Sequence, residues 1–418
     1  MARILVLSSR LPYPPREGHQ LRTWNLLRAL ARAHEVILLS CLRRDDALDE
    51  CAPLRSILAE LETFPIRSEH SRSALFVDLA RSVLGRRRPF VAEKYSSRRM
   101  RARVAELLLQ CDLVHVDMLP LMSAVPTCRV PLVLDTHNVE HLLLRERAVR
   151  ETDWARRIFL HSQVAKLRRF ERDACRRADH VLTCSTDDAR ELAALAPQTP
   201  VSLVPNGVDV EQARPAAGIV PQPARMVFVG QMSWFPNRDG VQWFLTDVLP
   251  RIVAVRADAQ FTLIGKTAGL TVPPPLRAHV RLAGFVEDLK PEMHSAAIYV
   301  VPLRCGSGTR LKVLEAMAFG KAIVTTSIGS QGIDLERGKE ALFADDAESF
   351  AAAVLDLLAD PARVMQLGVA ARAKALARYD WHIIGRELLA TYDELLRAPA
   401  IDRFPDEFMD GRFGFTQR

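Results

Sequence analysis

The stretch IYVVPLRCGSGTRLKVLEAMAFGKAIVT (residues 298–325) carries the pattern that decides the fold. Two short apolar runs, 298–301 and 322–325, flank a segment at 310–319 whose apolar residues recur at helical spacing. A strand, a helix and a second strand in this order are typical of a βαβ unit, whose strands lie parallel in one sheet. Gly306 and Gly308 interrupt the pattern and predict a tight turn between the first strand and the helix.

The same alternation extends outward over most of the chain. Apolar runs that predict buried strands occupy residues 4–7, 36–39, 113–116, 132–134, 181–184, 226–229 and 261–264. Amphipathic stretches that predict helices occupy residues 21–32, 240–255, much of 347–377, and 383–396. Strands that alternate with helices predict the α/β class, with parallel sheets covered by helices.

A segment rich in Pro and Ala at 213–224 divides this alternation into two halves of similar size. The expected organisation is an N-terminal Rossmann-like domain at 1–204, a linker at 205–225, a second Rossmann-like domain at 226–378, a C-terminal helix at 379–397 and a tail at 398–418. The tail has no periodic pattern and is assigned no element. Two such halves predict a ligand cleft between them.

Composition excludes several classes of protein. The 418 residues are 49% hydrophobic and 26% charged, which is ordinary for a globular protein and excludes disordered, collagen-like and disulfide-scaffold chains. Seven cysteines without C-x-x-C spacing indicate reduced thiols and a cytoplasmic location. The apolar run at 4–7 is too short for a signal peptide, and no run approaches the ~18 apolar residues of a membrane-spanning helix.

The turn at 306–309 (Gly306, Ser307, Gly308 and Thr309) has the chemistry of a phosphate site. Small residues that leave a strand and enter a helix expose backbone N–H groups at the positive end of the helix dipole. Arg310 and Lys312 add two cations beside the turn, and the Glu315 carboxylate suits the hydroxyls of a ribose. The alternative is a capped helix with a solvent-exposed Lys312–Glu315 pair worth ~0.3 kcal/mol.

Two other motifs compete for the functional assignment. Gly265-Lys266-Thr267 follows a strand as a Walker loop does, but Gln260 stands where that motif needs its first glycine. Residues 137–141 (HNVEH) fit the inverted zinc-protease pattern, which needs both histidines on one helical face. The strand predicted just upstream places His137 instead on a loop at the carboxyl edge of the sheet, where α/β active sites lie. An ordinary loop histidine is the third interpretation.

The order and spacing of several segments over residues 1–395 resemble glycosyltransferase family four, the large retaining family with GT-B architecture. These segments are Tyr13-Pro14-Pro15 to Gly18, Asp135-Thr136-His137-Asn138, Pro205-Asn206-Gly207-Val208-Asp209, Val229-Gly230 near Asn237, residues 279–286 and residues 308–320. Residues 16–22 and 233–240 are most similar to a bacterial subgroup tied to exopolysaccharide or cell-surface sugar assembly. The resemblance implies two Rossmann-like domains facing across a cleft.

The resemblance also implies roles for single residues. Arg310 and Lys312 match the cations that grip the phosphates of a sugar nucleotide, and His137 matches a histidine near the reacting centre. The other implied donor-binding positions are Gly18 and Gly230 near the diphosphate, Phe285 and Val286 at the base, the turn of Gly306, Ser307, Gly308 and Thr309, and Glu315 at the ribose.

The chain departs from the family pattern at two places. The family often carries two glutamates separated by seven residues, and the first of these positions is Ser307 here, which leaves the donor sugar open. Gln231 stands where an arginine is common after the first strand of the second domain, so the cation contacts are expected at Arg238, Arg310 and Lys312.

The expected activity is transfer, with retention, from a nucleotide-diphosphate sugar to a surface glycan or a lipid-linked acceptor. Since the sequence has no D-x-D triplet, we expect Arg310 and Lys312, with the turn's backbone, to stabilise the leaving diphosphate without a metal or other cofactor. A sugar-nucleotide epimerase of GT-B fold and a non-catalytic nucleotide-sugar-binding protein remain alternatives.

Residues 81–110 hold nine basic and two acidic side chains, an excess equal to the net charge of +7 on the whole chain. Basic groups interleaved with apolar ones fit an anionic lipid surface, here the inner face of the cell membrane. A solvated face is the other interpretation. Nucleic acid is not expected, since aromatic residues are only 6% and no base-reading motif occurs.

Overall fold

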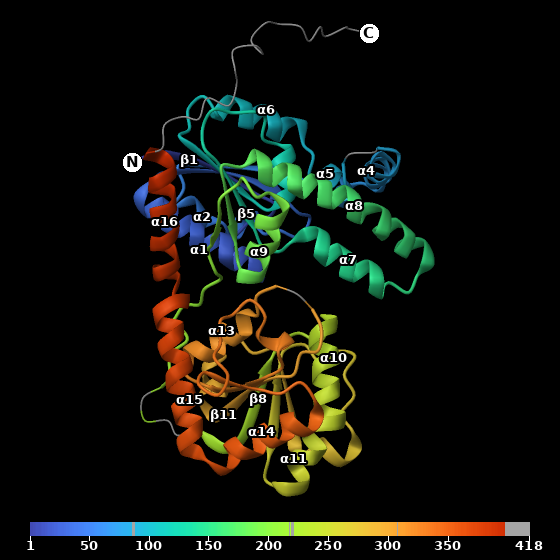
Figure 1. Cartoon of the computed structure of the whole chain (residues 1–418), viewed down its shortest axis with the longest axis vertical. Coiled ribbons are helices and arrows are strands. Elements are labelled where there is room, and N and C mark those ends of the chain that lie inside the picture. Colours follow the sequence, from blue (N-terminus) through green and yellow to red (C-terminus); the bar gives the residue numbers. More distant parts are fainter. Residues whose placement is uncertain (86–87, 217, 219–220, 307, 398–418) are drawn as a thin grey trace, which may run out of the picture. The chain divides into compact units, whose positions relative to one another are not determined.

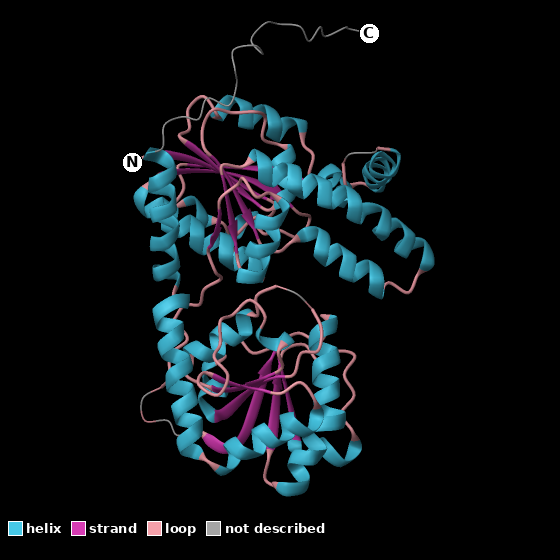
Figure 2. Ribbon diagram, in the orientation of Figure 1, coloured by secondary structure: helices cyan, strands magenta, loops and turns pink. Residues whose placement is uncertain are grey.

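The computed structural model describes residues 1–85, 88–216, 218, 221–306 and 308–397. Figure 1 follows the chain by colour, and Figure 2 marks its helices and strands. The chain divides into two compact units, each with its own hydrophobic core. Within the described residues, no helix has both the length and the apolar character needed to cross a membrane. None of the seven cysteines, all of which lie within the described residues, forms a disulfide.

The first unit contains residues 1–182 and 190–202, together with the chain from Arg386 onward. Its seven-stranded sheet has the order β3-β2-β1-β4-β5-β6-β7. The strands are β1 (Arg3–Ser8), β2 (Glu35–Leu42), β3 (Glu60–Pro65), β4 (Leu113–Asp117), β5 (Leu132–Thr136), β6 (His180–Thr183) and β7 (Val201–Leu203). Because β1 pairs in parallel with both β2 and β4, the strand order reverses at β1 and β4. Ligands of such sheets bind at the carboxyl ends of the strands beside this point.

Helices cover the first sheet. They are α1 (Gly18–Ala33), α2 (Ala52–Arg55), α3 (Arg67–His70), α4 (Arg72–Leu84), α5 (Phe90–Lys94), α6 (Arg98–Leu107), α7 (Glu140–Arg150), α8 (Trp154–Arg177) and α9 (Thr186–Leu195). Helix α1 begins at a capping box, in which the Glu17 N–H donates to Gln20 Oε1 (3.1 Å). Helices α7 and α8 pack against each other along their length (Figure 1).

The second unit contains residues 183–189 and 203–385. Its six-stranded parallel sheet has the order β10-β9-β8-β11-β12-β13. The strands are β8 (Gln222–Val229), β9 (Gln260–Ile264), β10 (Val280–Gly284), β11 (Ala296–Val301), β12 (Ala322–Thr325) and β13 (Ala341–Phe343). Here the strand order reverses between β8 and β11, so the carboxyl ends of these two strands frame the expected ligand position.

The helices of the second unit are α10 (Phe235–Trp243), α11 (Leu249–Val255), α12 (Lys290–Ser295), α13 (Leu311–Ala318), α14 (Ala347–Ala359) and α15 (Pro361–Lys374). The single helix expected at 240–255 is interrupted by a π-helical turn at Phe244–Val248, just before Pro250 of α11. Helix α16 (Trp381–Arg397) begins in the second unit and ends in the first, where Tyr392 Oη lies 2.5 Å from His115 Nδ1. The predicted α/β class with two parallel sheets is confirmed.

Candidate functional site

In the second unit, two glycine-containing segments meet at the carboxyl ends of β8 and β11. Gly230 directly follows β8, and the turn that contains Gly306 and Gly308 joins β11 to α13. Gly306 has φ 105° and Gly308 has φ 82°, in the left-handed region that side chains disfavour. The turn therefore needs glycine at both positions, and it delivers the chain to the start of α13.

Lys312, on the first turn of α13, points at the Gly230 backbone. Its Nζ donates to Asn237 Oδ1 (2.6 Å) and lies 4.2 Å from the centroid of the Phe228 ring. A Cβ on Gly230 would lie 2.9 Å from this Nζ, so only glycine leaves room for the lysine. Burial, and then the charge of Arg310, lower the pKa of Lys312 to about 7.

Arg310 lies at the start of the same helix and is 3% exposed. Its guanidinium stacks over the Trp234 ring, 5.8 Å from the centroid, and its Nε donates to the Ile328 carbonyl (3.4 Å). A Cβ on Gly306 would lie 3.2 Å from the guanidinium, so this glycine lets the turn approach the cation. Two cations thus converge beside the turn, which suits an anionic ligand.

Glu315 lies one helical turn after Lys312. Burial raises the pKa of Glu315 to about 6, while the charge of Lys312 opposes the shift. Both side chains are half-buried, which differs from the solvent-exposed pair of the alternative interpretation. The hydroxyl oxygen of Thr309, at the end of the turn, is buried and has no hydrogen-bond partner among the described residues. A buried polar atom of this kind favours a ligand at the turn.

Three further predicted donor-binding residues lie on other segments of the second unit. Arg238 is half-buried on the first turn of α10, and its Nη1 lies 3.4 Å from where a Cβ of Gly269 would be. Phe285 and Val286 follow β10, with Phe285 73% exposed. Ser307 lies outside the described residues.

The first unit gathers a second polar cluster, at the carboxyl ends of β4 and β5. His137 directly follows β5, and its Nε2 lies 2.6 Å from Asp117 Oδ1. The other oxygen of Asp117 accepts hydrogen bonds from Ser8 Oγ and Thr23 Oγ1, both at 2.9 Å. Asp117 therefore holds the imidazole in one orientation and leaves Nδ1 as its second functional nitrogen.

Opposite charges shift the pKa values of this pair. Burial disfavours both charged forms, but the Asp117 carboxylate outweighs burial and raises the pKa of His137. His137 in turn holds the pKa of Asp117 well below its usual range, against the effect of burial. The ring of His19 lies 6.5 Å from that of His137, and burial lowers the pKa of His19 to about 4. The electrostatic environment therefore acts in opposite directions on these two neighbouring imidazoles, since it lowers the pKa of His19 and raises that of His137.

Asp135 extends the cluster beneath His137. Arg22 binds this carboxylate with two hydrogen bonds, from Nε (3.0 Å) and Nη2 (2.7 Å), and both side chains are 1% exposed. Ligand atoms of Asp117, Asp135 and His137 lie within 4.8 Å of one another, as a metal site would need. The guanidinium of Arg22 already supplies the cation to Asp135, so the donor set is better suited to this ion pair than to a metal.

The inverted zinc-protease interpretation requires His137 and His141 on one helix. Helix α7 begins at Glu140, so His137 lies on the preceding loop, as the strand prediction implied. His141 Nδ1 instead contacts Glu171 Oε2 of α8 at 2.5 Å. The two histidines engage different carboxylates, and the geometry of that motif is not formed.

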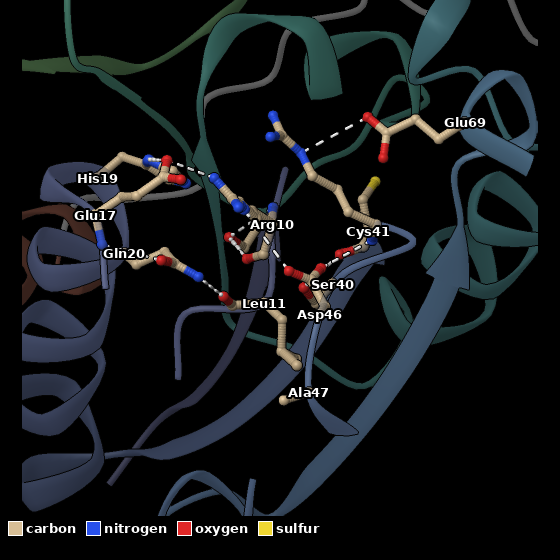
Figure 3. Close-up of polar contacts among 12 residues, drawn as sticks. Arg10, Leu11, Glu17, His19, Gln20, Ser40, Cys41, Asp46, Ala47 and Glu69 are labelled. Atoms are coloured by element: carbon tan, nitrogen blue, oxygen red, sulfur yellow. Dashed lines mark hydrogen bonds and ion pairs between the residues drawn. The ribbon is translucent and has the colours of Figure 1, made fainter. Parts of the chain in front are cut away.

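Gly18 begins α1, on the loop that follows β1. Figure 3 shows Arg10 between Glu17 and Asp46, with Arg10 Nη1 2.5 Å from Glu17 Oε2 and its Nε 3.7 Å from Asp46 Oδ1. Gln20 ties the same loop back by donating to the Leu11 carbonyl (2.9 Å). These contacts fix the loop and place the exposed Gly18 N–H end of α1 at the carboxyl edge of the first sheet.

The sequence interpretation assigned no site role to Asp117, Arg22 or Asn237. Asp117 directly follows the apolar run at 113–116, just as Asp135 follows the run at 132–134. This matching position at the end of a predicted strand could have indicated that Asp117 lies at the carboxyl edge of the sheet near His137. Arg22 and Asn237 lie 113 and 75 residues from their partners, so no local pattern indicates them.

Comparison with known proteins adds two family models. The model described as Glycosyltransferase Family 4 matches residues 17–212, and the model described as Glycosyl transferases group 1 matches residues 223–360. A phosphatidyl-myo-inositol mannosyltransferase of Mycolicibacterium smegmatis is 30% identical over 206 residues, which are 46% of this chain and 51% of the relative. The chain thus spans about half the length of the curated relatives it matches.

Solved structures match over nearly the whole chain. Sucrose-phosphate synthase from Thermosynechococcus elongatus gives a TM-score of 0.67 at 18% identity and covers 95% of this chain and 100% of its own. HepE from Anabaena, solved with UDP, gives 0.64 at 14% identity and covers 94% and 100%. These similarities confirm the expected GT-B fold of two Rossmann-like domains. With both family models matched in order along the sequence, the chain belongs to glycosyltransferase family 4.

Proposed function

We propose that this protein is a retaining glycosyltransferase that transfers a sugar from a nucleotide-diphosphate sugar to a surface glycan or a lipid-linked acceptor. The observation that carries the proposal is the pair of cations beside the Gly306–Gly308 turn, the buried Arg310 and the half-buried Lys312, at the reversal of strand order. Solved relatives of the same fold hold UDP or UDP-glucose, and a sequence relative is named for a phospholipid acceptor, which supports both reactant classes.

The second unit supplies donor binding. When the glycosidic bond breaks, negative charge grows on the diphosphate, and cations and N–H groups fixed in advance stabilise it without reorganisation. Lys312, Arg310 and the backbone of the turn carry this charge in the proposal, without a divalent metal. Glu315 accepts hydrogen bonds from the ribose, while Phe285 and Val286 contact the base and Arg238 adds a peripheral cation.

The first unit supplies the acceptor side. Retention by attack on the face that the diphosphate leaves needs no protein nucleophile, so no covalent intermediate with the chain is proposed. His137, oriented through Nε2 by Asp117, presents its Nδ1 to the reactants and orients the sugar or exchanges a proton with the acceptor hydroxyl. Gly18 lies at the N-terminus of α1, where a diphosphate is favoured by the helix dipole.

The proposal is tested by two variants with matched controls. Lys312→Ala and His137→Ala should each lower turnover at least about a hundredfold, because each removes a group that acts on the reacting centre. Lys339→Ala and His161→Ala, at exposed positions of the same two units, should keep near-normal rates. The measurement is nucleotide release with and without an added acceptor, after thermal unfolding has shown that each variant is folded.

The same assay separates the alternatives. Release that requires an acceptor supports transfer, whereas conversion of the nucleotide sugar without an acceptor indicates an epimerase. Binding of nucleotide diphosphates in a thermal-shift panel without turnover indicates a binding protein. Near-normal rates in both variants would rule out the proposed site.

A further inference from the structure

The first unit has a basic pocket that shares no residue with the Asp117–His137 cluster. It has a volume of about 680 Å³ and is lined by α6, α8 and the loops at 88 and 123–127. Its charged lining consists of four arginines, Arg88, Arg101, Arg169 and Arg177, and one carboxylate, Asp173. Four guanidinium groups around one hollow with a single acidic side chain suit an anion with several oxygens, such as a phosphate.

Two of the arginines are held in place by neutral acceptors. Arg101 Nη2 donates to the Ser123 carbonyl at 3.0 Å. Arg177 donates through Nη1 to the Met122 carbonyl (3.1 Å) and through Nη2 to the Val125 carbonyl (2.7 Å). These carbonyls orient the two guanidinium groups, and the four arginines of the lining outnumber its one carboxylate, which favours a positive potential in the pocket.

Beside the pocket, helix α4 exposes large apolar side chains. Phe76 is 70% exposed, Val83 55% and Leu84 83%, and Arg88 of the pocket follows four residues after Leu84. The described residues of the first unit leave these side chains exposed, and α4 lies at the outer side of this unit in Figure 1. Exposed apolar groups next to cations are typical of a surface that lies in the membrane interface.

Helix α8 contributes residues to the pocket and also contacts the C-terminal end of α4, which carries the exposed Val83 and Leu84. Lys166 Nζ donates to the carbonyls of Ser82 (2.5 Å) and Gly85 (2.8 Å) and so holds the C-terminal end of α4 against α8. Arg169 lies one turn beyond Lys166 on the same helix. The apolar side chains and the arginines are therefore fixed on neighbouring elements rather than on independent loops.

We infer that this surface binds an anionic phospholipid bilayer, with a lipid phosphate in the arginine pocket and Phe76 and Leu84 in the acyl boundary. The inference goes beyond the proposed function and does not depend on the donor site. The positive charge of the arginine pocket favours an anionic lipid. The exposed apolar side chains of α4 favour a bilayer over a soluble phosphate.

The test is flotation of the full chain with vesicles of phosphatidylcholine alone or with about 30% phosphatidylglycerol, at low and high salt. Binding is expected only to the anionic vesicles and should weaken as salt rises. Arg169→Glu should lower the bound fraction at least about fivefold, whereas Arg168→Glu, an exposed neighbour outside the pocket with the same charge change, should lower it less than about twofold. Phe76→Ser combined with Leu84→Ser should also release the protein, while Val255→Ser, at an exposed apolar position of the second unit, should not.

Three outcomes would overturn the inference. Equal loss with Arg168→Glu and Arg169→Glu would show general attraction by net charge and no pocket. Retention of anionic-vesicle binding by the Phe76/Leu84 variant, with full competition by inorganic phosphate, would show a site for soluble phosphate. Absence of binding to anionic vesicles at low salt would remove the surface altogether. Thermal unfolding of each variant, together with its nucleotide binding, shows whether the chain is still folded.

Discussion

The two clusters at the carboxyl ends of the sheets differ in how their charges are balanced. In the first unit, Arg22 binds Asp135 and His137 binds Asp117, each at hydrogen-bond distance, so each of these two basic side chains faces a carboxylate. In the second unit, Lys312 donates to the neutral amide of Asn237, and burial together with the charge of Arg310 lowers its pKa to about 7. The first cluster is electrostatically complete, whereas the second is best completed by an anion.

This difference suggests that the first cluster serves mainly to hold residues in place, whereas the second serves mainly to bind a ligand. The buried pairs of the first unit fix the orientation of His137 and contribute to folding. The lysine of the second unit is held in a position that costs it part of its charge, and a bound diphosphate would restore that charge. Substitutions in the first cluster should therefore affect stability first, and substitutions in the second should affect affinity first.

Arg22→Ala should give the largest effect on stability. It leaves the Asp135 carboxylate, 1% exposed, without its two guanidinium hydrogen bonds, and breaking a buried pair in this way costs about 3–5 kcal/mol. Urea unfolding of the first unit measures the loss. Arg28→Ala, at an exposed position of the same helix, should change the unfolding free energy by less than about 1 kcal/mol. Similar losses in both variants would show that the pair is not the source of rigidity.

Gly230→Ala should act on the second cluster instead. The new methyl would lie 2.7 Å from Asn237 Nδ2 and 2.9 Å from Lys312 Nζ, so the lysine and its amide partner must separate. Loss of charge-assisted hydrogen bonds to a diphosphate should weaken its affinity about 10- to 100-fold. Isothermal titration with a nucleoside diphosphate measures the change.

Ser233→Ala, at an exposed position of the same loop, is the matched control and should bind normally. Normal affinity in Gly230→Ala would mean that Lys312 does not contact the phosphates.

The fold was predictable from the sequence where burial is complete, and least so at the sheet edges. Strands β1, β4 and β11 are buried at nearly every position, and their continuous apolar runs identify them. Edge strands β3 and β10 are mostly half-buried or exposed, with Leu282 46% exposed, so they carry no such run and were missed. A continuous apolar run in the sequence indicates a strand that is buried on both faces. Edge strands are partly exposed, so their sequences lack such a run.

The residues of the candidate site also differ in how far the sequence predicts them. Lys312 and His137 lie in segments whose local pattern of strand, turn and helix already places them at a carboxyl edge. Their partners Asn237 and Asp117 come from other strands, and only the strand order brings them within 3 Å. Strand order depends on long-range pairing, which the local pattern does not contain.

Lys312→Arg should remove a pH dependence that the wild type shows. Because the pKa of Lys312 is about 7, its charge is lost as the pH rises from about 6 to 9, and diphosphate affinity should fall by up to tenfold per pH unit. The ligand itself gains negative charge over this range, so its own titration works in the opposite direction. Arginine stays charged throughout, and its variant should lose the slope even if its affinity at pH 6 is lower. An unchanged slope would assign the titration to another group.

Asp117→Asn should give the smallest of these effects, and we expect to see it most directly in the proton affinity of His137. The carboxylate raises the pKa of His137 against the effect of burial, so its neutral replacement should lower that pKa. Since the folded-state pKa lies above the unfolded value, the pair stabilises the wild type below about pH 6.5 and ceases to do so as pH rises through the folded-state pKa. Titration of the histidine side chains by NMR measures the shift, and Asp49→Asn, an exposed carboxylate of the same unit, should leave it unchanged. An unshifted His137 in Asp117→Asn would mean that the dyad only positions the ring, and that the charge balance of the first cluster comes from Arg22 and Asp135 alone.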